Sequence, residues 1–164
     1  MTQVIGRSEL ATAEFINLLA QNGGTPTVVW VVDPALSAPG AGPGPLTELA
    51  AELTAAGVQS MVASTTFPRE PKISQVDALA AEIRGVANPI VIAVGGGSTM
   101  DGAKLAAAVA VAPDETLGYA LCARDFKGAP IPSICVPTTS GTGSEASRTS
   151  IASTEEGAKM GFWG

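Results

Sequence analysis

PIVIAVGGGSTMD, residues 89–101, joins an apolar run to three consecutive glycines and then to a stretch of small residues. The run over residues 89–94 predicts a buried strand, and the small residues over 99–111 predict a helix. A strand that enters a glycine turn and leaves it as a helix brings backbone N–H groups and the positive end of the helix dipole to one point. The stretch therefore predicts an α/β fold with a turn that can hold an anion.

The same alternation continues on both sides of this unit. Apolar, β-branched runs predict strands over residues 27–33, 58–63 and 131–136, and amphipathic stretches predict helices over residues 9–21, 46–56 and 74–85. Strands that alternate with helices pair in parallel through right-handed crossovers. We therefore expect one domain over residues 1–164, with a Rossmann-like, doubly wound, mainly parallel sheet flanked by helices. Residues 161–164 are expected to be too few to complete a further strand.

Composition excludes several classes of protein. Apolar residues make up 46% of the 164 residues and charged residues 15%, as in a globular domain with a core. The net charge of −6 argues against a nucleic-acid binder, because phosphate neutralisation needs clustered Lys and Arg. No apolar run approaches the roughly 20 residues of a membrane span, and the N-terminus lacks the features of a signal peptide. We therefore expect a cytoplasmic protein with neither a membrane nor a nucleic-acid partner.

Cysteine and histidine usage limits the chemistry further. Cys122 and Cys135 are too few for a disulfide framework, and both are expected to be buried, reduced thiols. The sequence contains no histidine. This absence excludes Ser-His-Asp hydrolysis within the chain and removes the commonest transition-metal ligand.

The first glycine turn has two interpretations. Backbone N–H groups of Gly95, Gly96, Gly97 and Ser98 can hold a pyrophosphate, because glycine lets the backbone approach a phosphate closely. Alternatively, Ser98 caps the helix, Asp101 completes a capping box, and the glycines only make a tight turn. Lys104, one turn further, is expected to be a solvated helix residue rather than a phosphate ligand.

A second glycine segment, PTTSGTGSE over residues 137–145, also follows a predicted strand. Parallel strands bring their carboxyl ends to the same edge of a sheet, so we expect this segment to project beside the first turn. Its five hydroxyl side chains suit phosphate or ribose oxygens, although Ser and Thr are also frequent in turns. The two segments together predict a nucleotide clamp.

The order and spelling of these segments resemble the iron-containing (group III) alcohol dehydrogenases. That family carries a GGGS-x-x-D turn, then PTT-x-GTGSE, then EEG-x-K, and the last matches residues 155–159 here. The resemblance covers roughly residues 2–159. Glycerol dehydrogenase and dehydroquinate synthase are related scaffolds, but the GTGSE spelling fits the alcohol dehydrogenases better.

The resemblance implies an NAD site with a defined polarity. It implies that Gly96, Gly97 and Ser98 hold the pyrophosphate, that Thr138 and Thr139 contact the phosphates or the nicotinamide side, and that Asp101 and Lys159 lie at the nicotinamide ribose. Asp33 matches the family's acidic residue at the adenosine ribose, where a carboxylate accepts hydroxyl bonds and repels a 2′-phosphate, so NAD is expected rather than NADP. The alternative for Asp33 is a residue that starts the turn at Pro34. The candidate cofactor-binding residues are Asp33, Gly95, Gly96, Gly97, Ser98, Asp101, Thr138, Thr139, Thr142, Ser147 and Lys159.

The resemblance also implies what this chain lacks. In the family, divalent iron or zinc is held by one aspartate and three histidines of a helical C-terminal domain, which is expected to be absent here. We therefore predict no catalytic and no metal-binding residue in the chain, and little or no turnover by the chain alone.

Two functions remain open at this point. The first is the NAD(P)-binding half of a metal-dependent dehydrogenase that interconverts an alcohol and an aldehyde or ketone by hydride transfer. The second is a non-catalytic dinucleotide-binding module or an inactive remnant. The expected partners are a small alcohol or aldehyde, further copies of the chain, or a complementary metal-binding chain.

Overall fold

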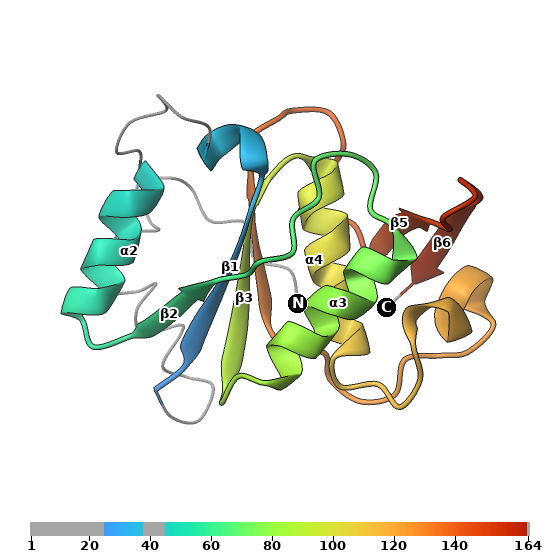
Figure 1. Ribbon diagram of the computed structural model, residues 1–164, viewed down its shortest axis with the longest axis horizontal. Helices are drawn as coiled ribbons and strands as arrows, with labels where there is room; N and C mark the ends of the chain where they lie inside the picture. Colours follow the sequence, from blue (N-terminus) through green and yellow to red (C-terminus); the bar gives the residue numbers. More distant parts are fainter. Residues whose placement is uncertain (1–24, 38–44, 164) are drawn as a thin grey trace.

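A computed structural model describes residues 25–37 and 45–163 (Figure 1). Four parallel strands form its main sheet, in the order β2-β1-β3-β4. They are β1 (Thr27–Val32), β2 (Gln59–Val62), β3 (Pro89–Gly95) and β4 (Ser133–Pro137). All four were expected from the apolar runs, and their bounds differ from the prediction by two residues or fewer. The helix predicted over residues 9–21 lies outside the described residues.

Helices cover both faces of this sheet (Figure 1). On one face, Leu49 and Leu53 of α2 (Pro45–Ala55) pack against the apolar side chains of β1 and β3. On the other face lie α3 (Ile73–Arg84) and α4 (Gly97–Val109), which bury Val29 and Val31 of β1. The alternation of β1 side chains between two helix layers explains why this strand is apolar at nearly every position. The predicted doubly wound α/β fold is confirmed.

The strand order creates one reversal of direction in the sheet. From β1 the chain moves outward to β2, then returns past β1 to β3 and continues away from it to β4. The two halves of the winding therefore diverge between β1 and β3. In open α/β sheets, ligands bind at such a switch point, outside the carboxyl ends of the strands.

Two short 3-10 helices occupy the loops, η1 (Pro34–Ser37) and η2 (Thr116–Cys122). The first follows β1 directly after Asp33. The second ends in two left-handed residues, Leu121 at φ 53° and Cys122 at φ 60°, and both are exposed. The expectation that Cys122 is buried is therefore wrong.

Among the described residues, no helix combines the length and the apolar character needed to cross a bilayer.

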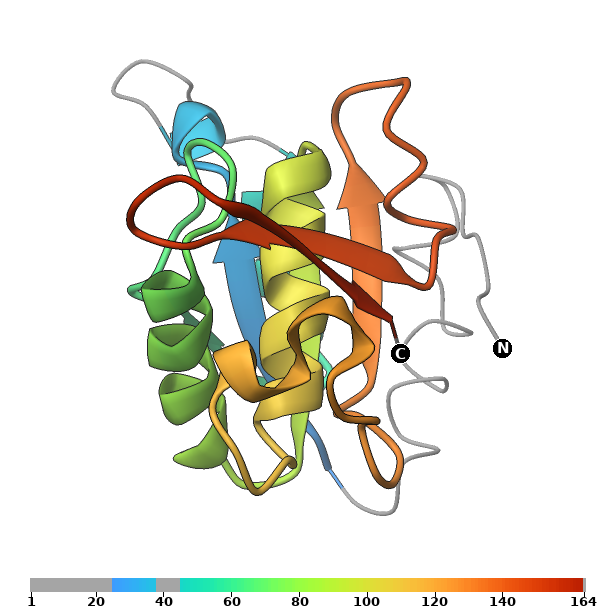
Figure 2. The same ribbon diagram turned by 90° about the vertical axis from the view of Figure 1, so that its right-hand side faces the viewer.

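A β-hairpin at the end of the chain was not predicted. Strand β5 (Thr149–Ser153) pairs antiparallel with β6 (Lys159–Trp163), and the hairpin crosses over α4 on the side away from the sheet (Figure 2). Ala152 and Phe162 point into the core, with 0% and 1% of their surface exposed. The expectation that residues 161–164 are too few for a strand is wrong, because the strand begins at Lys159, just after the turn at Gly157 (φ 91°).

Candidate functional site

The carboxyl ends of β1, β3 and β4 bring three of the predicted residues to one edge. Asp33 follows β1 and donates its backbone N–H to the carbonyl of Val94 at 2.9 Å. Thr138 follows β4 and donates its N–H to the carbonyl of Gly95, the last residue of β3, at 3.0 Å. The site therefore lies at the switch point between β1 and β3, with the second glycine segment beside it.

Helix α4 begins inside the first glycine turn. Its N-cap is Gly96 (φ −80°, ψ −175°), and no side chain caps the helix. Ser98 lies within the first turn, so the capping-box interpretation with Ser98 as the cap and Asp101 as its partner is wrong. The first N–H groups of an α-helix have no acceptor within the helix. The uncapped start of α4 therefore presents donors and a positive dipole end at the sheet edge.

The second glycine segment lies directly against the first. A Cβ atom built on Gly96 would lie 3.3 Å from Thr139 Oγ1, and one built on Gly97 would lie 2.8 Å from Thr142 Cγ2. Successive glycines of the turn are thus in contact with hydroxyl residues spaced three apart in the other segment. The structure brings the two halves of the predicted clamp together.

The glycines differ in the space around them. A Cβ atom on Gly95 would lie 2.6 Å from Thr99 Oγ1 and 2.8 Å from Asp33 Cβ. Gly95 and Gly97 are therefore required by packing of the protein on itself. At Gly96 the contact is looser, because the nearest atom is Thr139 Oγ1 at 3.3 Å, a tight distance at which the hydroxyl would have to shift by a few tenths of an ångström.

Thr99 was not singled out from the sequence. Its side chain is completely buried beneath the turn, and its Oγ1 has no hydrogen-bond partner among the described residues. An unpaired buried hydroxyl is uncommon and costs free energy, since it has left water without a replacement partner. Only its place directly after Ser98 could have drawn attention to it.

Asp33 makes the turn contact that was one of its two interpretations. Its Oδ1 accepts the N–H of Ala35 at 2.9 Å, which is the turn-forming contact expected before Pro34. That bond uses one of the two carboxylate oxygens. The Cβ atom of Asp33 lies beside Gly95, at the switch point, and the ribose contact of its carboxylate stays a prediction.

Asp101 and Ser147 contact the segment that leads into the hairpin. Asp101 Oδ2 accepts the N–H of Ile151 at 3.1 Å, and its Oδ1 lies 3.3 Å from Lys104 Nζ in an ion pair without hydrogen-bond geometry. Ser147 Oγ donates to the carbonyl of Thr149 at 3.0 Å. Lys104 is also engaged, with only 17% of its side chain exposed, so the expectation that it is solvated is wrong.

Lys159 begins β6 and pairs with a residue outside the two glycine segments. Its Nζ lies 2.6 Å from Glu70, in the loop between β2 and α3, and 71% of its side chain is exposed. Glu70 also accepts a hydrogen bond from Ser153. The hydrogen bond from Lys159, which has the largest effect, and the one from Ser153 both lower the pKa of the Glu70 carboxyl. The pair ties the hairpin to the loop before α3.

Cys135 on β4 is expected to be unreactive, because burial raises the pKa of its thiol to about 11. At pH 8 a thiol with this pKa is thiolate in only about one molecule in a thousand. Ellman's reagent should therefore modify one thiol per native chain, the exposed Cys122, and two in urea. The Cys122→Ser variant should show no fast reaction. Two fast thiols in the native protein would contradict the assignment.

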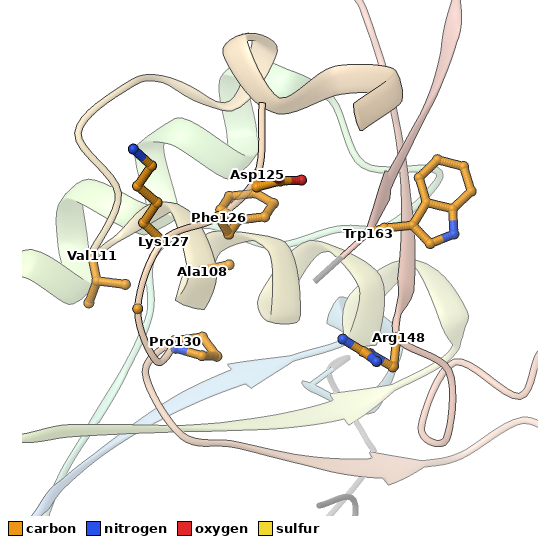
Figure 3. A pocket seen from close by; sticks show the side chains of 9 residues that line it. Ala108, Val111, Asp125, Phe126, Lys127, Pro130, Arg148 and Trp163 are labelled. Atoms are coloured by element: carbon orange, nitrogen blue, oxygen red, sulfur yellow. The ribbon is translucent and has the colours of Figure 1, made fainter. Parts of the chain in front are cut away.

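One pocket lies away from this edge, beside the C-terminal end of α4 (Figure 3). It encloses about 510 Å³ between α4, the loop around Phe126 and the outer ends of the hairpin strands. Its walls include Ala108, Val111, Phe126, Pro130, Arg148 and Trp163. None of the candidate cofactor-binding residues lines it, so this pocket is separate from the glycine segments.

The residues present do not fit a transition metal. Within residues 25–37 and 45–163, no three His, Cys, Asp or Glu side chains gather where they could hold an ion. The whole sequence lacks histidine. No chemistry at a metal can therefore be assigned to side chains that the structure describes.

Comparison with known proteins gives relatives of one kind. The 4-hydroxybutyrate dehydrogenase of Cupriavidus necator is 40% identical over 111 residues, covering 65% of this chain and 28% of that protein. The probable alcohol dehydrogenase EutG of Salmonella typhimurium is 42% identical over 84 residues, covering 51% of this chain and 21% of that protein. A solved structure of sulfoacetaldehyde reductase from Bifidobacterium kashiwanohense in complex with NAD+ superposes with a TM-score of 0.73 at 25% identity, covering 96% of this chain and 40% of that one.

The chain thus spans well under half the length of each of these proteins. A family model described as iron-containing alcohol dehydrogenase matches residues 4–164. The match covers nearly the whole sequence and both glycine segments. The chain belongs to the iron-containing alcohol dehydrogenase family.

Proposed function

We propose that this chain binds NAD at the switch point between β1 and β3 and is the cofactor-binding part of a metal-dependent alcohol dehydrogenase. One observation carries the proposal. Two glycine segments and Asp33, all predicted to bind a dinucleotide, meet at the carboxyl edge of one parallel sheet. That edge is where doubly wound folds bind their ligands.

The sheet edge where the two glycine segments meet suits the pyrophosphate best. The uncapped N-terminus of α4 supplies N–H donors and a positive dipole end, and Gly96 has no side chain to keep a phosphate from the backbone. Thr139 and Thr142 lie against the same turn and carry hydroxyl donors toward it. In this arrangement Ser98, Thr138 and the two threonines bind the phosphates from two sides.

The adenosine end is assigned to Asp33. A carboxylate at the end of β1 accepts hydrogen bonds from ribose hydroxyls and repels a 2′-phosphate. NAD is therefore the proposed cofactor rather than NADP. The resemblance assigns Asp101 and Lys159 to the nicotinamide side and Ser147 to the cofactor at no particular end, and each of the three has a protein partner in the structure.

The complete reaction needs more than a bound cofactor. NAD, when bound, supplies or accepts the hydride, and this chain's residues hold it. A carbonyl must also be positioned and its oxygen polarised as charge develops. The family metal, iron or zinc, has no fitting residues in the described part of this chain. We therefore assign polarisation of the substrate to residues outside this chain, in a longer protein or a complementary chain.

The substrate is proposed to be a small alcohol, aldehyde or ketone. The relatives named as a 4-hydroxybutyrate dehydrogenase and a sulfoacetaldehyde reductase support this class. A second candidate function is a binding module without turnover. NADH oxidation with a short aldehyde, measured with the metal-binding part present in a longer protein or as a complementary chain, separates the two, because only the first function then gives turnover. Turnover at ordinary rates by the chain alone would contradict both assignments.

Substitution of Gly96 tests the proposed site. Gly96→Val should weaken NADH binding by about tenfold or more, because its side chain would occupy the space beside the turn that a phosphate needs. Fluorescence titration with NADH measures this. Gly97→Val is less informative, since its side chain would strike Thr142 even without a ligand.

Gly118→Val is the matched control, because a Cβ atom there meets only Asp114 Cβ at 3.4 Å. This variant should bind NADH as the wild type does. Equal binding by wild type and Gly96→Val would remove the glycine turn from the site. Absence of binding by the wild type itself would favour an inactive remnant.

A further inference from the structure

We infer that Lys104 is a positioning residue that holds the second glycine segment over the first and thereby sets the affinity for the dinucleotide. Lys104 lies in the middle of α4, the helix whose N-terminus forms the first glycine turn. Its side chain reaches across to the chain that follows the second segment. The affinity part of this inference rests on the proposed function, whereas the positioning part rests on contacts alone.

The ammonium group of Lys104 donates hydrogen bonds to three backbone carbonyls. Nζ donates to the carbonyls of Ser144 at 2.7 Å, Thr149 at 3.0 Å and Ser147 at 3.2 Å. Ser147 Oγ lies at 3.4 Å as a further acceptor. A lysine ammonium has three protons, so these contacts use all of them. No proton remains for a phosphate, and Lys104 is therefore assigned to the protein and not to the ligand.

These contacts fix a segment that has little regular structure of its own. Between β4 and β5 the chain makes turns only, and Ala146, Ser147 and Arg148 are exposed. Hydrogen bonds from a charged donor are stronger than neutral ones. A lysine side chain that is only 17% exposed is unusual unless its charge is satisfied. Three carbonyls and the nearby Asp101 carboxylate satisfy it here.

A second link from α4 completes the attachment. Asp101, one helical turn before Lys104, accepts the N–H of Ile151. The segment from Ser144 to Ile151 is thus bound to α4 at both ends. At its upstream side, Thr142 lies against Gly97 at the start of the same helix. Because Lys104 and Gly97 belong to the same helix, the contacts of Lys104 determine how the second segment sits over the turn.

Lys104→Met tests the inference, since methionine keeps much of the side-chain length and removes the charge and all three donors. NADH affinity should fall about tenfold, and amide hydrogen exchange over residues 144–151 should accelerate. Lys127→Met is the control, because Lys127 is exposed and lies outside the clamp. Its NADH affinity should stay within about twofold of the wild type. Unchanged affinity and unchanged exchange in Lys104→Met would overturn the inference.

Chemical rescue separates positioning from general stability. In Lys104→Ala, added n-propylammonium should restore NADH affinity several-fold, because it returns N–H donors to the vacated space. Tetramethylammonium has the same charge and no N–H donor, so it should restore nothing. Equal restoration by both cations would overturn the inference that Lys104 positions the second segment through its hydrogen bonds.

Failure of the proposed function remains distinguishable from failure of this inference. If the wild type does not bind NADH, the NAD assignment and the affinity part fall together. The positioning part is then decided by exchange in the free protein. Faster exchange over residues 144–151 in Lys104→Met supports it, and exchange equal to that of the wild type overturns it.

Discussion

Phe67→Ala is expected to lower the free energy of unfolding by about 3–5 kcal/mol. Phe67 lies in the loop between β2 and α3, is 1% exposed, and belongs to the core beneath α3 and α4. Its ring lies so close to Gly102 of α4 that a Cβ atom there would be 2.6 Å from the ring. Truncation therefore removes buried surface and leaves a cavity against the helix that forms the site.

Urea unfolding measures this effect, with the midpoint shifted and the slope unchanged. Leu117→Ala is the control, because Leu117 is 55% exposed and should change stability by about 0.5 kcal/mol or less. A double-mutant cycle with Gly102→Ala sharpens the result. The added methyl should destabilise the wild type and fit into the cavity of Phe67→Ala, so the two effects should not be additive. A loss under about 1 kcal/mol in Phe67→Ala would contradict the packing.

The parallel sheet could be predicted because its strands carry strong local signals. The runs in β1 and β3 are apolar and β-branched, and burial on both faces produces such runs. The meeting of the two glycine segments followed from topology, since parallel strands end at one edge. Both predictions depended on residues close together in sequence, or on a general rule of sheet geometry.

The features that the sequence analysis missed depend on contacts between segments that are far apart in the sequence. Lys104 was interpreted as solvated because its helix neighbours give no sign that residues 144–149 lie over it. The hairpin was missed because β5 and β6 contain only five residues each, and mixed polar and apolar residues in so short a run give little periodicity. Phe67 lies in a polar, Pro-broken loop, and nothing local indicated its burial against Gly102.

Glu82→Ala is expected to lower the free energy of unfolding by about 2–4 kcal/mol at pH 7, because four donors would lose a charged acceptor. Glu82 lies on α3 and accepts the backbone N–H and the hydroxyl of both Ser64 and Thr65. These two residues follow β2 at the carboxyl edge of the sheet. A single carboxylate thus holds the start of the loop that carries Phe67.

The effect of Glu82 should depend on pH in one direction. Desolvation, the largest single influence, raises the pKa of Glu82, but the four hydrogen bonds from Thr65 and Ser64 together outweigh it and lower the pKa below its ordinary value of 4.5. The unfolded chain then takes up the proton more readily than the folded one, so the stabilisation is complete above pH 4.5 and is lost as the pH falls through the folded pKa.

Unfolding of the wild type and Glu82→Gln, compared at pH 7 and near pH 3, measures this dependence. The difference between them should be large at pH 7 and should shrink at the lower pH. Glu52→Gln, on the exposed side of α2, is the control and should differ little from the wild type at either pH. If Glu82→Gln is equally destabilised at both pH values, Glu82 acts through packing and shape, and the carboxylate charge is not what holds Ser64 and Thr65.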